Sequence, residues 1–145
     1  MPLITVTVST PHHKVLAKAA IAAEVARLST TILRKDPKVT AVIVSRVPSD
    51  DWFCGGQSLT QAWLASFWLD IHVTDGTNTK DEKAAFVAAA FQAMERLLGP
   101  LHEESYVHVH DVRGDAYGYG GLTQERRYIA AQLAAPVAVA TAAAA

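Results

Sequence analysis

The chain opens with a regular alternation of apolar and polar residues. Ile4, Val6 and Val8 are separated by threonines, and this period of two residues is typical of a strand with one buried face. A second apolar-rich segment, residues 39–47, is followed by the turn sequence PSDDWFCGG. Both segments are predicted to be strands.

A helical pattern lies between these two strands. Apolar side chains recur there at three- and four-residue spacing, which predicts a helix with one apolar stripe: Val15, Ala19, Ala22, Val25, Leu28 and Ile32. We expect Ser9 or Thr10 to cap this helix and Pro11 to lie in its first turn, where a missing N–H costs nothing. The helix should end near Asp36–Pro37, because a residue before proline avoids the α-helical region.

The second half of the chain repeats this order of elements. Strands are predicted over residues 67–74 and 105–112, and the turn sequence RGDAYGYGG follows the second of them. Between the two strands, a helix is expected to begin at a capping box of Thr79 and Glu82 and to end at Gly99–Pro100. Each half therefore has the order β-α-β followed by a glycine-rich turn.

The two halves match without a gap when Pro2 is aligned with Phe67. The matched positions include a strand valine, an aromatic residue and a glycine pair: Val8 falls on Val73, Trp52 on Tyr117, and Gly55–Gly56 on Gly120–Gly121. We predict one domain over residues 1–128, built from repeats 2–56 and 67–121. The alanine-rich tail, 129–145, is expected to be disordered beyond a short helix.

Two β-α-β units side by side predict an α+β fold with a four-stranded sheet. Right-handed crossover connections place both helices on one face of that sheet. The other face is then expected to carry a mixed set of side chains: Thr5, Thr7, Asp70, His72, His108 and His110. A closed ring of chains buries such a face and pairs the edge strands, so we predict a homo-oligomer.

Charge and cysteine content exclude several classes of function. The 145 residues carry a formal net charge of -1, which argues against nucleic acid as a partner. No stretch of about 18 apolar residues precedes the tail, which is itself too weakly hydrophobic for a membrane span. Cys54 is the single cysteine and no leader pattern precedes the first strand, so we expect a cytoplasmic protein without membrane association.

Pro2 stands directly before the first strand, although a residue without an N–H adds nothing to a sheet. Removal of Met1 leaves the nitrogen of Pro2 as a secondary amine. The pKa of an α-amino group is about 8 in water, and apolar surroundings lower that pKa. A neutral amine can accept a proton and return it elsewhere, which makes Pro2 a candidate general base.

The opening MPLITVTVS, the β-α-β order and the turns VPSDDWFCGG and VRGDAYGYGG together resemble the tautomerase superfamily, whose type member is 4-oxalocrotonate tautomerase. The resemblance runs from Pro2 to Arg127 and is similar to members that fuse two β-α-β units. It implies a tautomerase or MIF-like fold, a homotrimer and no cofactor. It also implies an isomerase that interconverts the enol and keto forms of a small 2-oxo or unsaturated acid, with Pro2 as the only active proline of each chain.

The resemblance also implies residues that bind the carboxylate substrate. Trp52 and Tyr117 match the aromatic residue that forms an apolar wall beside the proline in the family. The positions of the family's carboxylate-binding arginines are occupied here by other residues: His12, Thr77, Ala41 and Tyr106. Of these, His12 stays a candidate, and Tyr106 could donate a hydrogen bond to an oxyanion.

Arginines elsewhere in the chain are alternative cations for the substrate. Arg46 and Arg113 lie near strand ends, and Arg126 with Arg127 follows the second turn. A planar guanidinium binds a carboxylate through two hydrogen bonds, which histidine does not reproduce.

The sequence YVHVHD raises the possibility of metal binding. It places His108 and His110 on one face of a strand, and two imidazoles at this spacing can reach one ion. No cysteine or carboxylate completes a recognisable ligand spacing, so we expect hydrogen-bonded histidines inside the oligomer and no metal.

Two further functions stay open at this point. The same proline in its protonated form could act as an acid in dehalogenation or hydration of an unsaturated acid. The missing arginines also fit a trimeric binding module that has lost catalysis. A base requires the neutral amine and an acid requires the protonated one, so a pH profile separates the two enzyme readings.

Overall fold

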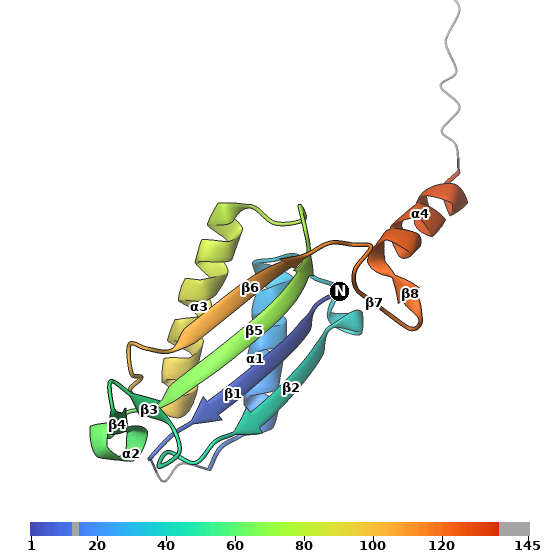
Figure 1. The fold of residues 1–145 in the computed structure, drawn as a ribbon. Coiled ribbons are helices and arrows are strands. Elements are labelled where there is room, and N and C mark those ends of the chain that lie inside the picture. Colours follow the sequence, from blue (N-terminus) through green and yellow to red (C-terminus); the bar gives the residue numbers. More distant parts are fainter. Residues whose placement is uncertain (13–14, 137–145) are drawn as a thin grey trace, which may run out of the picture. The chain divides into compact units, whose positions relative to one another are not determined.

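The computed structural model describes residues 1–12 and 15–136 and contains one four-stranded sheet, with strand order β2-β1-β5-β6 (Figure 1). Its strands are β1 (Leu3–Ser9), β2 (Ala41–Arg46), β5 (Ser66–Thr74) and β6 (Tyr106–Val112). β1 runs parallel to β2 and antiparallel to β5. The predicted α+β fold with a four-stranded sheet is confirmed.

β6 lies beside β5 with the same direction. The Ser66 hydroxyl lies 3.0 Å from the Ser105 hydroxyl, Asp70 hydrogen-bonds His110, and the His72 ring stacks on the His110 ring. Since residue numbers rise together on both strands, the pairing is parallel. Each half of the sheet is therefore a β-α-β unit, and the two units join along the β1–β5 pair.

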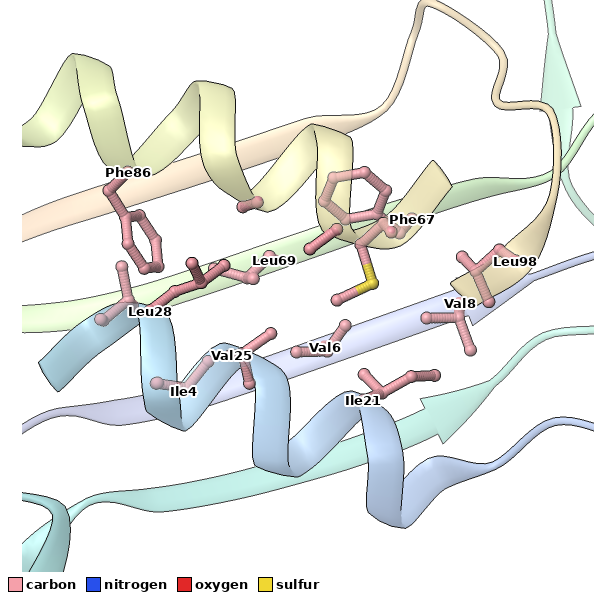
Figure 2. Packing of buried hydrophobic residues seen from close by; sticks show 14 of the residues in the cluster. Ile4, Val6, Val8, Ile21, Val25, Leu28, Phe67, Leu69, Phe86 and Leu98 are labelled. Atoms are coloured by element: carbon pink, nitrogen blue, oxygen red, sulfur yellow. The ribbon is translucent and has the colours of Figure 1, made fainter. Parts of the chain in front are cut away.

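Helices α1 (Lys18–Thr31) and α3 (Lys80–Leu98) cover one face of the sheet (Figure 1). Between sheet and helices lies a core of fully buried side chains, shown in Figure 2, that includes Ile4, Val6, Val8, Phe67, Leu69, Ile21, Val25, Phe86 and Leu98. Removal of such apolar surface from water is the main favourable term in folding. The alternating apolar and polar residues of β1 thus lie on the inner and outer faces of the sheet, respectively.

α3 has the predicted ends. The Thr79 hydroxyl accepts a hydrogen bond from the Glu82 N–H, the Glu82 carboxylate accepts one from the Thr79 N–H, and Gly99 ends the helix. This reciprocal capping satisfies backbone donors that have no partner inside the helix. The capping box and the stop at Gly99 are both confirmed.

The predicted ends of the first helix are wrong. α1 begins only at Lys18, well beyond Pro11, and its N-cap makes no side-chain hydrogen bond. The Thr10 hydroxyl donates instead to the Leu98 carbonyl and accepts from the His12 N–H, which ties this segment to the end of α3. At the other end, α1 stops at Thr31, and Asp36 caps the separate short helix η1 (Pro37–Val39).

The repeat is visible in the two hairpins that follow the β-α-β units. The first pairs β3 (Phe53–Cys54) with β4 (Gln57–Ser58), and the second pairs β7 (Gly118–Tyr119) with β8 (Leu122–Thr123). Each strand of the second hairpin falls on its counterpart in the alignment that places Pro2 on Phe67. Both turns use two glycines with positive φ, which only glycine adopts readily: Gly55 57°, Gly56 83°, Gly120 58° and Gly121 78°.

The chain divides into two compact units, Met1–Asp111 and Val112–Ala145. Within the second unit, the β7–β8 hairpin leads into α4 (Gln124–Ala134), as β4 leads into the short helix α2 (Leu59–Ala62) in the first unit. The last part of α4, residues 129–134, lies in the tail, where a short helix was predicted. The part of the tail predicted to be disordered, 137–145, lies outside the described residues. Across the described residues, every helix falls short of the length and apolar character that crossing a bilayer requires.

The sheet face opposite α1 and α3 carries the predicted mixed set of side chains. Thr5 pairs with Asp70 and Leu3 with His72, so these residues alternate with the core positions. The same face exposes large apolar side chains, among them Ile43 at 55%, Trp68 at 48% and Tyr106 at 52%. An open face of this composition favours association with another chain.

Candidate active site

A cleft of about 640 Å³ lies at the carboxyl ends of β1 and β2, on the open face of the sheet. Its lining comes from the ends of three strands and the turn after β2: Thr7, Val47, Asp51, Trp52, Phe53, Trp68, Tyr106 and His108. Two residues predicted to bind substrate, Trp52 and Tyr106, thus come together in one cleft. Five of these eight lining residues carry aromatic rings, and Asp51 is the one carboxylate in the described lining.

The turn after β2 holds Trp52 in place. The Leu59 N–H donates to the Trp52 carbonyl at 2.9 Å, and Gly55–Gly56 allows the β3–β4 hairpin to form directly beyond it. Cys54 follows in the same hairpin and is buried. Burial and the Glu104 carboxylate raise the pKa of the Cys54 thiol, although a hydrogen bond from the Trp52 side chain acts in the opposite direction. A thiol with a raised pKa is a poor nucleophile.

Pro2 lies at the other end of β1. Its side chain is buried, and its carbonyl accepts a hydrogen bond of 3.2 Å from the Ala41 N–H. Because β1 and β2 are parallel, Trp52 lies beyond their carboxyl ends while Pro2 precedes their amino ends. β1 has seven residues, which corresponds to roughly 20 Å. Within one chain, therefore, Pro2 and Trp52 are far apart.

The amino end of β1 is an environment that disfavours a positive charge on an amine. Burial and the Lys35 ammonium lower the pKa of the Met1 α-amino group, and Asp36 acts weakly in the opposite direction. Lys35 is held in the connection after α1, where its Nζ donates to the Thr77 hydroxyl at 2.9 Å. Sequence reasoning missed Lys35, since its proximity to the first residues depends on where the α1–β2 connection returns to the sheet.

His12 lies outside the cleft. Its ring packs edge-to-face on Trp63 with centroids 5.1 Å apart, and its Cδ2 atom lies 3.0 Å from the position that a Cβ on Gly99 would occupy. Gly99 also has a φ of 94°, so two constraints favour glycine there. The histidine therefore packs against the carboxyl end of α3.

The candidate arginines are dispersed. Arg46 is the last residue of β2 and pairs with Val8, a core-facing position, so its side chain leaves the sheet on the face opposite the cleft. In the second unit, Arg113 donates from Nε and Nη2 to Asp115 at 3.0 and 2.8 Å. That ion pair lowers the pKa of Asp115. Neither arginine is in the described lining of the cleft.

Tyr117 belongs to the second unit, as the counterpart of Trp52. It is half-buried, and its carbonyl accepts a hydrogen bond of 3.0 Å from the Gln124 N–H. This bond is the counterpart, in the second repeat, of the one between Leu59 and Trp52. Tyr117 helps to line a smaller hollow of about 330 Å³ around the β7–β8 hairpin.

Two aromatic residues of the cleft were not predicted. Phe53 is 63% exposed beside Trp52, and Trp68 is 48% exposed on β5 opposite Thr7. Trp68 lies two residues before Asp70, so the same alternation of strand positions that places Asp70 and His72 on the open face also places Trp68 there. The sequence therefore contained enough information to predict Trp68 on this face. Phe53 depends on the geometry of the turn.

Solved structures share the fold of this chain. A structure described as a fused 4-OT wild type symmetric trimer superposes with a TM-score of 0.72 at 20% identity, over 85% of this chain and 96% of the other. A protein described as Pt0534 inactivated by 2-oxo-3-pentynoate gives a TM-score of 0.73 at 15% identity, over 86% and 98%. The chain has the fused 4-OT fold. A macrophage migration inhibitory factor-like protein from Entamoeba histolytica shares that fold with a TM-score of 0.68 at 20% identity, over 84% and 97%.

Comparison of sequences finds no relative that would support the fused 4-OT fold assignment. No protein-family model matches the chain, and no curated protein matches it significantly. The fold assignment and the aromatic cleft therefore rest on the structure.

Proposed function

We propose that this chain is a cofactor-independent tautomerase in which Pro2, after removal of Met1, is the general base. One observation carries the proposal: Pro2 is buried directly before β1, where burial and Lys35 lower the pKa of the neighbouring Met1 α-amino group. A lowered pKa keeps more of the nitrogen neutral near pH 7, as a base requires. The fused 4-OT fold supports the same class of reaction.

The chemistry follows from a neutral secondary amine. The nitrogen of Pro2 accepts the proton of an enol hydroxyl while the C–O bond becomes a carbonyl and the double bond moves. The resulting ammonium group returns the proton to carbon, which gives the ketone and restores the base. The substrate is a small 2-oxo or unsaturated acid, whose negative charge is attracted to the Lys35 ammonium.

We propose that each site is shared between chains of a homotrimer. The aromatic cleft with Trp52 and the base Pro2 lie at opposite ends of β1 in one chain, so a neighbouring chain must bring them together. The exposed apolar side chains on the open sheet face supply a surface for that association. Trimers described for other fused 4-OT structures agree with this stoichiometry.

The environment of the amino terminus also distinguishes between the two proposed roles of Pro2, general base and general acid. A general acid has to be protonated, and the same burial and Lys35 charge oppose protonation. These surroundings favour a base over an acid that hydrates or dehalogenates an unsaturated acid. Activity is expected to fall as the pH drops through the lowered pKa of the amine.

The proposal is tested by labelling with 2-oxo-3-pentynoate, the reagent in the description of the Pt0534 structure. A neutral amine can add to the triple bond conjugated with the ketone, so the protein gains the whole mass of the reagent. We expect one adduct per chain, located on Pro2 by peptide mapping, with parallel loss of enol ketonisation. Protein that retains Met1 is the control, because its proline nitrogen is an amide. An adduct elsewhere, or equal labelling of the control on another residue, contradicts the proposal.

A further inference from the structure

Three potential metal ligands converge on the open face of the sheet. Asp70 comes from β5, and His108 and His110 come from the adjacent β6. Asp70 Oδ1 lies 2.7 Å from His110 Nε2 and 3.3 Å from His108 Nδ1. One ligand atom from each residue lies within 4.8 Å of the other two.

These separations suit a small divalent ion. With metal–ligand bonds of about 2.0–2.1 Å, two ligand atoms of a tetrahedral ion lie about 3.3 Å apart. The Asp70–His108 separation already has that value, and the Asp70–His110 pair needs to open by about 0.6 Å. This adjustment involves side chains on two neighbouring strands of the sheet.

The surroundings prepare the cluster for binding. His72 stacks on His110 with ring centroids 4.7 Å apart and planes 11° apart, and this contact fixes the orientation of the ligating ring. In the separate chain, the side chains of His108 and His110 are 46% and 42% exposed.

We propose that Asp70, His108 and His110 form a binding site for a divalent transition-metal ion of the zinc type. Two imidazoles and one carboxylate are a ligand set that such ions accept, with at least one position left for water or another ligand. The inference goes beyond the tautomerase proposal and does not depend on it. It also revises the expectation from the sequence, because the missing carboxylate comes from β5, in a segment distant along the chain from the strand of His108.

The experiment is calorimetric titration of chelator-treated, folded protein with Zn²⁺, followed by a visible absorption spectrum with Co²⁺. We expect saturable binding of one Zn²⁺ per chain and d–d bands of Co²⁺ in a site of low coordination number. Asp70→Asn, His108→Gln and His110→Gln should each weaken Zn²⁺ binding by at least about 100-fold, above the loss that follows removal of an outer-shell partner.

His102→Gln is the matched control. His102 lies outside the cluster, where its Nδ1 accepts a hydrogen bond from the Glu104 N–H, so this variant should bind Zn²⁺ as the unaltered chain does. Circular dichroism of each variant verifies folding, and Asp70→Asn keeps the shape of the side chain if a histidine variant fails to fold. The proposal is overturned if no saturable binding occurs, if the three variants bind normally, or if the control loses binding equally.

Discussion

The Lys35 ammonium donates a hydrogen bond of 2.9 Å to the hydroxyl of Thr77. Thr77 occupies a position at which the resemblance to tautomerases leads one to look for a carboxylate-binding arginine. We propose that Lys35, from the connection after α1, supplies the cation that this position lacks in the sequence. Lys35 also lowers the pKa of the amino terminus, so one charge can serve both the substrate and the base.

Replacement of Lys35 by glutamine should change the pH profile of the reaction. Loss of the positive charge raises the pKa of the Pro2 amine, so the acid limb of kcat/KM should move to higher pH. KM for a carboxylate substrate should rise about two- to fivefold, as expected for an ion pair worth up to about 1 kcal/mol. Steady-state kinetics across the acid range measure both effects.

Lys38→Gln is the control for this variant, because Lys38 is an exposed lysine in the adjacent helix η1. Its pH profile should match that of the unaltered chain. Identical profiles for all three proteins would show that Lys35 does not act in the site.

Mixing two inactive variants tests whether sites are shared between chains. Pro2→Ala and Trp52→Ala should each reduce activity at least about tenfold alone, the latter through lost apolar contact. When trimers form at random from equal amounts of the two variants, about one site in four combines an intact Pro2 from one chain with an intact Trp52 from its neighbour. About a quarter of the activity of the unaltered protein should therefore return.

The double variant Pro2→Ala with Trp52→Ala, mixed with either single variant, serves as the control. These mixtures lack one of the two intact residues altogether and should stay inactive. Failure of the two single variants to complement each other would place the base and the cleft in separate sites.

The open sheet face should be essential for assembly. Ile43→Glu places a charge on an exposed apolar position of β2, opposite the helices, and should dissociate the trimer because burial of an unpaired charge is costly. Val87→Glu is the control, since Val87 is 40% exposed on α3. Light scattering should give three chains for the unaltered protein and for the control, and one chain for Ile43→Glu. A monomeric unaltered protein would disprove the assembly.

The capping box of α3 should contribute measurably to stability. Thr79→Ala removes the hydroxyl that accepts from the Glu82 N–H and should lower the free energy of unfolding by about 1 kcal/mol. Thr31→Ala is the control, because its hydroxyl donates only to carbonyls of its own helix, and a change within about 0.5 kcal/mol is expected. Urea denaturation of both variants measures the difference, and equal stabilities would argue against the cap.

Local patterns in the sequence were sufficient for most of the fold. The alternation at Ile4, Val6 and Val8 identified the inner face of β1, and the glycine pairs identified the two turns in which the β3–β4 and β7–β8 hairpins form. The start of α1 was mispredicted because Pro11 fits the first turn of a helix locally. The Thr10 hydroxyl instead reaches the carbonyl of Leu98, at the far end of α3, and such tertiary contacts override local preference.

The candidate site was predictable only in part. Trp52 and Tyr106 could be found through the resemblance to the tautomerase superfamily, and both line the cleft. Lys35 near the amino terminus could not be found. Asp70 was predicted on the same face as His108 and His110, but its contact with them could not be predicted, since both results depend on how segments distant in sequence pack or align. The pairing of β5 with β6 decides which carboxylate meets His108, and sequence spacing does not contain that register.

The central claim is that the nitrogen of Pro2 moves the proton. Its most direct test is kcat/KM for ketonisation of phenylenolpyruvate, measured on protein whose intact mass shows that Met1 has been removed and on the matched Pro2→Ala variant. We predict a loss of at least about 100-fold in the variant, the lower range for a general base. Equal rates for the two proteins would contradict the account.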